Sequence, residues 1–525
     1  MATLSDCLDA ALRISCAPMK SKGSVYLVGA GPGDAGLLTL RGAELLREAD
    51  VVVYDVLVNP ALLRLAPATA ELVSRKNHKG AEAMSQAELN ELIVTRAQAG
   101  KNVVRLKGGD PYIFGRGGEE AEVLAAAKIH FEVVPGVSSI TAAANYAGIP
   151  LTHRAHCSSF TVFTGHSDSA DASTALRYEQ IAKIPGTKVV LMGTDNLADW
   201  TQSLIAHGMA PETPVAIVES GTTGKQKSVA GTLATIAQLA AERKIAPPAI
   251  TIVGDVVKLR GKLNWFENRP LFGQRIVVTR RSEQMGSFAH RLTRLGADVL
   301  EVPTIKLAEP TDRMAIVDAL LALNSYDWLV FTSANGVTAF FDLFFKRFHD
   351  MRDIGGARIA AVGPATAAKL RELHLQVDLM PEEFVGKKIA EAFEKFETIE
   401  NLKICLLRAE VANADLPRAL EEFGAIVDDI PIYKTVAETA DPGEAGARLI
   451  ADGADWVTFT SSSTVEHFHA RFNLPQLVKK FPQLKLASIG PETTKAIAAL
   501  NLKPALEAKP HTTDGLISGL LKTAK

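Results

Sequence analysis

An internal repeat constrains the fold of the C-terminal half more than any other feature of this chain. Ile276–Arg280 resembles Ile404–Arg408, and Asp327–Ser333 resembles Asp455–Ser461, each pair lying 128 positions apart. Further pairs of blocks keep this offset or fall one residue short of it. One offset held over several blocks indicates a duplicated unit. We therefore expect two similar lobes of alternating strands and helices, each flavodoxin-like, that face one another.

The N-terminal half also alternates strand-like and helical patterns. The strand pattern Ser24–Gly29 leads into a glycine-rich turn and a helical stretch at 38–49, and Val51–Tyr54 is the next expected strand. This alternation is typical of a parallel sheet. After residue 155 the strands are more β-branched and the helices fewer, which predicts a mixed sheet in a second lobe.

The resulting organisation is an α/β protein of several units, as a length of 525 residues allows. We expect an N-terminal extension, a two-lobed unit, a linker and a duplicated unit. Their bounds are 1–23 for the extension, 24–263 for the two-lobed unit with lobes at about 24–150 and 155–263, 264–274 for the linker, and 275–525 for the duplicated unit.

Composition narrows the function classes. The formal net charge of −2 predicts no general attraction to nucleic acid. The four cysteines, at positions 7, 16, 157 and 405, lack zinc-ligand spacing and favour a reducing compartment. No apolar run reaches the roughly 18 residues of a membrane span. The start of the chain lacks a cleavable signal pattern, so we expect a cytoplasmic protein.

A dense glycine-rich loop, Lys107–Glu120, follows the strand pattern Asn102–Leu106 and precedes a helical one. Glycine lets the backbone approach a ligand closely, and ligands bind where strands of open α/β sheets pass into helices. No Walker lysine follows the loop, so we do not expect a phosphate cradle. Gly29–Gly33 partly matches a dinucleotide fingerprint, and Asp55 stands where a ribose-binding carboxylate would. A nicotinamide-dependent dehydrogenase is therefore the weakest alternative.

Taken together, residues 24–263 resemble uroporphyrinogen-III C-methyltransferases. The resemblance rests on blocks in the family's order: Val28–Asp34, Tyr54–Val58, Arg105–Glu120, Val134–Ser139, Ala147–Arg154 and Thr164–His166. It implies a two-lobed tetrapyrrole methyltransferase fold with S-adenosylmethionine in the cleft between the lobes, and no metal. The residues implied to touch this donor are Pro32, Gly108, Gly109, Asp110, Ile113, Ser138, Ser139, Met192 and Gly221.

The resemblance also implies catalytic and substrate-binding positions. Asp55 matches a position for acid–base work, and a carboxylate there could accept the proton released after methyl transfer. The catalytic-type lysine is expected at Lys76, with Arg75 and Lys79 as open alternatives. The tetrapyrrole carries many carboxylates, so basic side chains should surround it. The candidates are Arg105, Lys107, Arg116 and Arg154. We interpret His153, His156 and His166 as structural, because their spacing matches no standard metal cluster.

Residues 270–521 resemble uroporphyrinogen-III synthase, through Pro270–Arg280 and the repeat blocks. That enzyme closes hydroxymethylbilane to uroporphyrinogen III, which is the substrate of the first half. Four strand-to-helix turns of the repeat offer capping side chains and free backbone N–H groups that can bind anions. The expected contacts there are Ser333, Thr366, Ser461 and Thr493. Tyr433 matches a family position that helps the hydroxyl leave.

These resemblances predict a bifunctional enzyme that makes uroporphyrinogen III and methylates it twice to precorrin-2, on the route to sirohaem and cobalamin. They imply a homodimer formed through the methyltransferase half. One alternative is a methyltransferase acting on another precorrin. In that alternative the C-terminal half is a non-catalytic tetrapyrrole-binding module.

Overall fold

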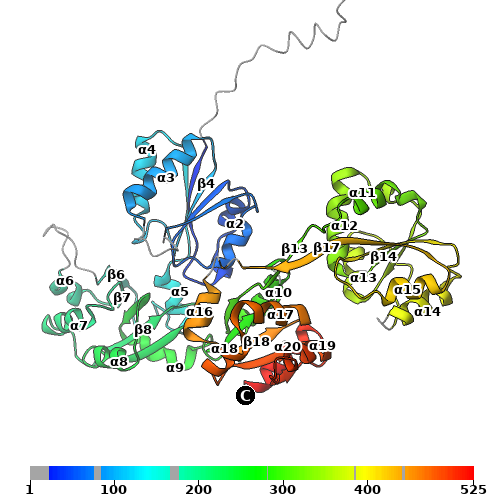
Figure 1. The fold of residues 1–525 in the computed structure, drawn as a ribbon. Helices are drawn as coiled ribbons and strands as arrows, with labels where there is room; N and C mark the ends of the chain where they lie inside the picture. Colours follow the sequence, from blue (N-terminus) through cyan, green and yellow to red (C-terminus); the bar gives the residue numbers. More distant parts are fainter. Residues whose placement is uncertain are drawn as a thin grey trace, which may run out of the picture.

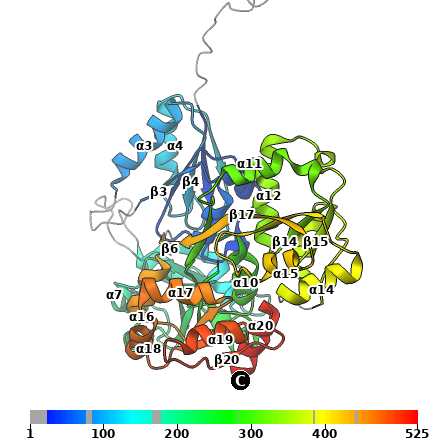
Figure 2. The ribbon, with the colours of Figure 1, turned by 45° about the vertical axis from the view of Figure 1, so that its right-hand side comes forward.

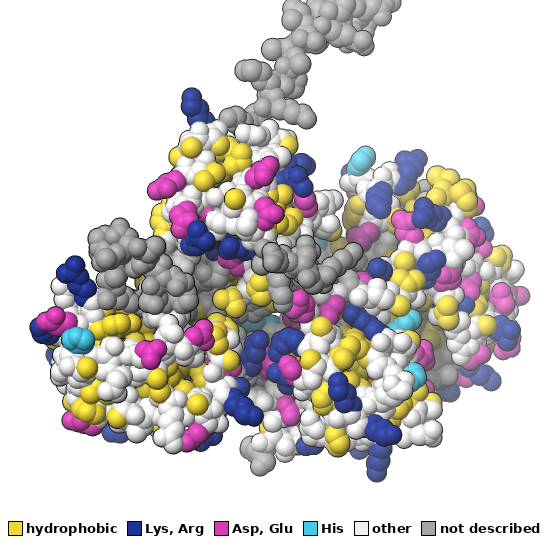
Figure 3. Space-filling view, turned by 60° about the vertical axis from the view of Figure 1, so that its left-hand side comes forward, with side chains coloured by type: hydrophobic (Ala, Val, Ile, Leu, Met, Phe, Trp, Pro, Cys, Tyr) yellow, Lys and Arg dark blue, Asp and Glu magenta, His cyan; other side chains and the backbone are white. Residues whose placement is uncertain are grey.

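Within the residues that it describes, the computed structural model contains four five-stranded sheets, which form four lobes (Figure 1). It describes residues 23–75, 84–165, 177–280, 282–382, 386–439, 441 and 444–524. The predicted α/β architecture is confirmed. No helix in these described ranges is long and apolar enough to cross a membrane. On the face drawn in Figure 3, acidic and basic side chains are interspersed, as expected for a chain with little net charge.

The first sheet is wholly parallel, with the order β3-β2-β4-β1-β5. Its strands are β1 (Val25–Gly29), β2 (Val51–Tyr54), β3 (Glu71–Ser74), β4 (Val103–Lys107) and β5 (Phe131–Val134). Its helices are α2 (Leu40–Arg47), α3 (Gln86–Gln98), α4 (Gly117–Ala126) and α5 (Ser139–Tyr146). The central strands β1 and β4 are buried almost throughout, because helices cover both faces of such a sheet.

The second sheet, β6-β7-β10-β8-β9, is mixed, as its β-branched sequence predicts. Only β6 and β7 pair in parallel; the other neighbours are antiparallel. The strands are β6 (Phe160–Thr164), β7 (Thr187–Leu191), β8 (Pro214–Glu219), β9 (Lys227–Thr232) and β10 (Ala249–Val253). The helices are α6 (Tyr178–Lys183), α7 (Leu197–Ala206), α8 (Ile236–Glu242) and α9 (Arg260–Leu263).

The third sheet, β12-β11-β18-β19-β20, is parallel and has the flavodoxin-like strand order. Its strands are β11 (Arg275–Val278), β12 (Asp298–Glu301), β18 (Trp456–Phe459), β19 (Lys485–Ser488) and β20 (Leu506–Glu507). Its helices are α10 (Ser282–Arg294), α16 (Ala445–Asp452), α17 (Ser462–Phe472), α18 (Leu474–Lys480), α19 (Pro491–Ala498) and α20 (Thr513–Thr523).

The strand order of the fourth sheet is β13-β17-β16-β14-β15. Read from β15, its four parallel strands repeat the first four positions of the order in the third sheet, and β13 takes the fifth position as an antiparallel edge strand. Its strands are β13 (Ile305–Ala308), β14 (Trp328–Phe331), β15 (Arg358–Ala361), β16 (Lys403–Ala409) and β17 (Ile426–Ala437). Its helices are α11 (Met314–Leu321), α12 (Ala334–Arg347), α13 (Pro364–Glu372), α14 (Gly386–Phe396) and α15 (Asp415–Glu422).

The two copies of the repeat do not coincide with the two lobes. β11 and β12, which open the first copy, lie in the third sheet, whereas β14 and β15 of the same copy lie in the fourth. The second copy is split the opposite way, with β16 and β17 in the fourth sheet and β18 and β19 in the third. The chain crosses between the lobes along β13 and β17, which pair with each other (Figures 1 and 2). Each lobe therefore combines the start of one copy with the end of the other.

The segment expected to be a linker, 264–274, is held firmly by its surroundings. The Trp265 indole donates to the carbonyl of Asn145 at 3.0 Å, and Phe266 is buried against Tyr146. The Glu267 carboxylate accepts hydrogen bonds from Gln226, Ser228, Arg260 and Asn264, at distances of 2.6 to 3.0 Å. Toward the C-terminal half, the amide of Leu271 donates to the carbonyl of Leu295 at 2.9 Å, so the segment ties the two halves together.

Candidate active sites

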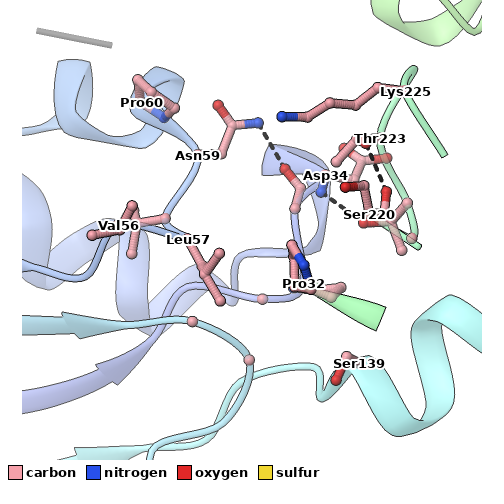
Figure 4. A pocket seen from close by; sticks show the side chains of 18 of the residues that line it. Pro32, Asp34, Val56, Leu57, Asn59, Pro60, Ser139, Ser220, Thr223 and Lys225 are labelled. Atoms are coloured by element: carbon pink, nitrogen blue, oxygen red, sulfur yellow. Dashed lines mark hydrogen bonds between the residues drawn. The ribbon is translucent and has the colours of Figure 1, made fainter. Parts of the chain in front are cut away.

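A cavity of about 1080 Å³ lies between the first two sheets (Figure 4). The loops after β1, β2, β4 and β5 form one side of it, and the loops after β7 and β8 form the other. All nine residues expected to touch a methyl donor line this cavity: Pro32, Gly108, Gly109, Asp110, Ile113, Ser138, Ser139, Met192 and Gly221. They come from distant parts of the sequence, so the fold alone brings them together.

Glycine lets three of these loops approach one another closely. Gly31 and Gly109 exchange backbone hydrogen bonds of 2.8 and 3.2 Å, which join the loops after β1 and β4. A Cβ added to Gly29 would lie 2.4 Å from the Cα of Gly136, in the loop after β5. Asp110 accepts the amides of Tyr112 and Gly136, at 2.8 and 3.0 Å. The Asp110 carboxylate therefore holds the loops after β4 and β5 together, and Asp110 also lines the cavity.

Hydrogen bonds also fix the loops around the cavity, and the one between Asp34 and Thr222 joins its two sides. The amide of Asp34 donates to the Thr222 hydroxyl at 3.0 Å, and the Tyr146 hydroxyl donates to the Asp34 carboxylate at 2.8 Å. Burial and the Asp34 charge raise the pKa of Tyr146. The Asn59 amide donates to the carbonyl of Gly33 at 2.7 Å (Figure 4). Sequence reasoning missed Asn59, Thr222 and Tyr146; the Asn-Pro turn signal at 59–60 was the only local sign of any of them.

The backbone is strained on the side of the cavity formed by the second sheet. Met192, Ser220 and Thr222 all have positive φ angles, of 51°, 49° and 70°, and all three line the cavity. Residues other than glycine adopt this conformation at a cost, and such residues cluster at ligand sites.

A row of charged side chains lies at the ends of β2 and β4. Asp55 accepts a hydrogen bond of 2.5 Å from Arg105 and lies 3.9 Å from Arg75. Arg105 also contacts Glu120 at 3.3 Å, and the Lys107 ammonium donates to Glu120 at 2.8 Å. Burial, and then the nearby Arg105, lower the pKa of Lys107. Asp55 itself does not line the cavity, but its neighbours Val56 and Leu57 do. The Asp55 side chain stays 23% exposed, so a substrate can reach it.

The structure does not support direct substrate contacts by Arg105 and Lys107. Both side chains are almost fully buried and neither lines the cavity. The reason is their position on β4, a central strand whose two faces are covered. Instead, Arg105 forms ion pairs with Asp55 and Glu120, and Lys107 forms one with Glu120.

The other expected basic residues lie outside the cavity lining. Arg116 is exposed before α4 and pairs with Glu119 at 2.6 Å. Arg154 is exposed in the turn between His153 and Cys157. Lys76 and Lys79 lie outside the described residues, as does His166. The rings of His153 and His156 are 5.0 Å apart, and the described residues contain no group of three or more metal-ligating side chains.

The four expected strand-to-helix turns of the C-terminal half are present. Ser333 caps α12 and accepts the Gly336 amide at 3.0 Å, and Ser461 caps α17 and accepts the Thr464 amide at 3.3 Å. Thr366 and Thr493 lie in the first turns of α13 and α19, but their side chains are buried. The Thr366 hydroxyl donates to the carbonyl of Val362. A substrate carboxylate at these two turns would therefore meet backbone amides rather than the threonine hydroxyls.

The structure brings Tyr433 and Ser333 together in the fourth-sheet lobe. Their hydroxyl oxygens are 3.0 Å apart, and Tyr433 is buried within β17. Arg408 is the next-to-last residue of the neighbouring strand β16, and its buried side chain forms an ion pair with Asp429. Arg408 was part of a quoted repeat block but was not singled out as a site residue. Ser461 and Thr493 belong to the other lobe.

Comparisons with known proteins agree with the resemblance expected for each half of the chain. The family model for tetrapyrrole (corrin/porphyrin) methylases matches residues 24–237, and that for uroporphyrinogen-III synthase HemD matches residues 286–518. The porphyrin biosynthesis protein HemD of Ruminiclostridium josui is 38% identical over 95% of this chain and 98% of its own length. The chain belongs to the family of this HemD protein. It fuses an S-adenosylmethionine-dependent uroporphyrinogen-III C-methyltransferase to a uroporphyrinogen-III synthase, both acting in tetrapyrrole biosynthesis.

Two relatives match the N-terminal half alone. The S-adenosyl-L-methionine-dependent uroporphyrinogen III methyltransferase of Methanosarcina barkeri is 54% identical over 45% of this chain and 93% of its own length. The solved uroporphyrin-III C-methyl transferase of Thermus thermophilus, complexed with S-adenosylhomocysteine, is 40% identical. It covers 45% of this chain and all of its own, with a TM-score of 0.39.

Proposed function

We propose that the cavity between the first two sheets binds S-adenosylmethionine and is the site where uroporphyrinogen III is methylated at two ring carbons to precorrin-2. The observation that carries this assignment is the convergence of nine expected residues on one cavity. Its volume of about 1080 Å³ slightly exceeds the range typical of small-molecule sites, about 300–1,000 Å³, so a nucleoside-sized donor fits. The glycine-lined backbone at 108–109 suits close approach of such a ligand.

In this proposal Asp55 accepts the proton that leaves the tetrapyrrole after methyl transfer. The donor's sulfonium supplies the activated methyl group, so the protein mainly aligns the reactants and moves a proton. Arg105 fixes the orientation of the Asp55 carboxylate through the 2.5 Å hydrogen bond. Glu120 in turn orients Arg105 and offsets its charge. Arg105 is therefore a positioning residue.

For the C-terminal half, we propose that Tyr433 assists departure of the hydroxyl group of hydroxymethylbilane. The Ser333 hydroxyl, 3.0 Å away, orients the phenol. The helix N-termini at Ser333 and Ser461, and those of α13 and α19, would hold substrate carboxylates through free backbone amides. Ring closure then delivers the substrate of the other half.

Two assays test the halves separately. Incubation with uroporphyrinogen III and S-adenosylmethionine should give a product heavier by two methyl groups, and no gain in mass would refute the methyltransferase assignment. Incubation with hydroxymethylbilane should give the type III isomer. Type I alone, at the spontaneous rate, would refute the synthase assignment.

We further propose that the protein is cytoplasmic and forms a homodimer through the methyltransferase half. Within the described residues, Cys157 and Cys405 are free thiols, as a reducing compartment favours. The dimer is supported by the resemblance of the N-terminal half to its family. Light scattering on the purified protein tests it, and a monomeric mass would contradict it.

A further inference from the structure

The cavity of the N-terminal half is completed by the C-terminal half. The third-sheet lobe contributes β12 and the first turn of α16 to the lining, including Asp298, Glu301, Ala445 and Arg448. β12 is the edge strand of its sheet and pairs only with β11. Asp298 is fixed within its own lobe by Arg275 and Arg448, at 2.9 and 2.8 Å. These ion pairs hold β12 and α16, the part of this lobe that lines the cavity, together.

Two contacts hold this wall against the methyltransferase half. Gly224, in the loop after β8, lies so close to β12 that an added Cβ would stand 2.2 Å from the carbonyl carbon of Ala297. Arg64, in the loop after β2, forms an ion pair with Glu301 of β12. Desolvation at this junction, and then the nearby Arg448, lower the pKa of Lys225, although part of its side chain stays in solvent.

The same loop contacts the expected donor site from its other side. Thr222 accepts the amide of Asp34, and a Cβ added to Gly33 would stand 2.7 Å from the Thr223 methyl group. Gly221 lines the cavity, and Figure 4 shows Lys225 extending from this loop toward Asn59. The short segment 221–225 therefore links the synthase wall directly to the Gly31–Asp34 turn.

We propose that the β12–α16 face of the synthase half is an interaction surface for the methyltransferase half, and that the methyl donor binds more tightly when the two are docked. The proposal rests on the assignment of the cavity to S-adenosylmethionine. Docking fixes the 221–225 loop before the donor arrives, so less ordering is left to occur during binding. Sites between domains often owe their shape to such contacts.

The test measures the affinity for S-adenosylhomocysteine by calorimetry in the full-length chain. Gly224→Ala should wedge the halves apart and weaken binding about tenfold, which corresponds to about 1.4 kcal/mol. Gly356→Ala is the matched control, because a Cβ at this exposed position in the fourth-sheet lobe meets nothing within 4 Å. It should bind as the wild type does.

A charge exchange provides an independent variant. Glu301→Arg should weaken binding by repelling Arg64, and adding Arg64→Glu should restore it. Wild-type affinity in both Gly224→Ala and Glu301→Arg would overturn this proposal and leave the donor site intact. If the wild-type protein itself failed to bind S-adenosylhomocysteine, the donor assignment would fall and this proposal with it.

Discussion

At the residue scale, the catalytic role proposed for Asp55 can be tested by substitution. Asp55→Asn removes the proton acceptor, so we predict a fall in the methylation rate of about 100-fold. Since Asp55 does not line the donor cavity, the affinity for S-adenosylhomocysteine should stay within about twofold of the wild type. Single-turnover methylation and calorimetry measure the two effects. A variant that loses donor binding instead would show that Asp55 acts structurally.

The catalytic role proposed for Tyr433 in the synthase half can be tested in the same way. Tyr433→Phe keeps the buried ring and removes the hydroxyl that contacts Ser333, so formation of the type III isomer should slow about 100-fold. Tyr326→Phe is a matched control in the same lobe, since its hydroxyl bonds Asp428 rather than a helix-capping residue. An unchanged isomer ratio in Tyr433→Phe would favour a non-catalytic binding module.

At the scale of elements, the hydrogen bonds of Glu267 in the segment 264–274 predict that the thermal stability of the protein depends on pH. Burial alone would raise the pKa of Glu267, but hydrogen bonds from Ser228, Arg260 and Gln226 lower it overall. A carboxylate with a lowered pKa stabilises the fold above its unfolded pKa of about 4.3, and this stabilisation is lost as the pH falls through the lowered value. Glu267→Gln should therefore melt below the wild type at pH 7, with the difference shrinking in acid.

Thermal unfolding followed from pH 7 to pH 3 tests this dependence. The matched control is Glu242→Gln, an exposed change on α8 that affects one hydrogen bond, to Gln238. It should melt like the wild type throughout this range. A constant difference between Glu267→Gln and the wild type would mean that the carboxylate charge contributes nothing to the tie.

Some elements of the fold could be predicted from the sequence and others could not. The glycine-rich turns and the mixed character of the second sheet were foreseen, because both depend on local residue types. The nine expected donor contacts, which line one cavity, were named through family resemblance rather than pattern, and their contact with the donor stays a prediction. The burial of Arg105 was not, because nothing local marks β4 as a central strand. The interleaving of the repeat was not foreseen either, since both copies have the same pattern and each start can pair with either end.

At the scale of the whole molecule, the residues proposed for the two reactions lie in different lobes. Asp55 follows β2 of the first sheet, and Tyr433 lies within β17 of the fourth. We predict that Asp55→Asn alone slows methylation about 100-fold without affecting ring closure, and that Tyr433→Phe has the opposite effect. An equimolar mixture of the two variants should again form dimethylated product, since each supplies the activity that the other lacks. Failure of the mixture would mean that uroporphyrinogen III does not pass between chains.

The most direct test of the central claim supplies hydroxymethylbilane and S-adenosylmethionine together to the wild-type protein. Mass spectrometry and isomer analysis then follow the products. The account predicts that type III uroporphyrinogen forms first and is converted to a product carrying two added methyl groups. Accumulation of unmethylated type I isomer at the spontaneous rate would contradict it.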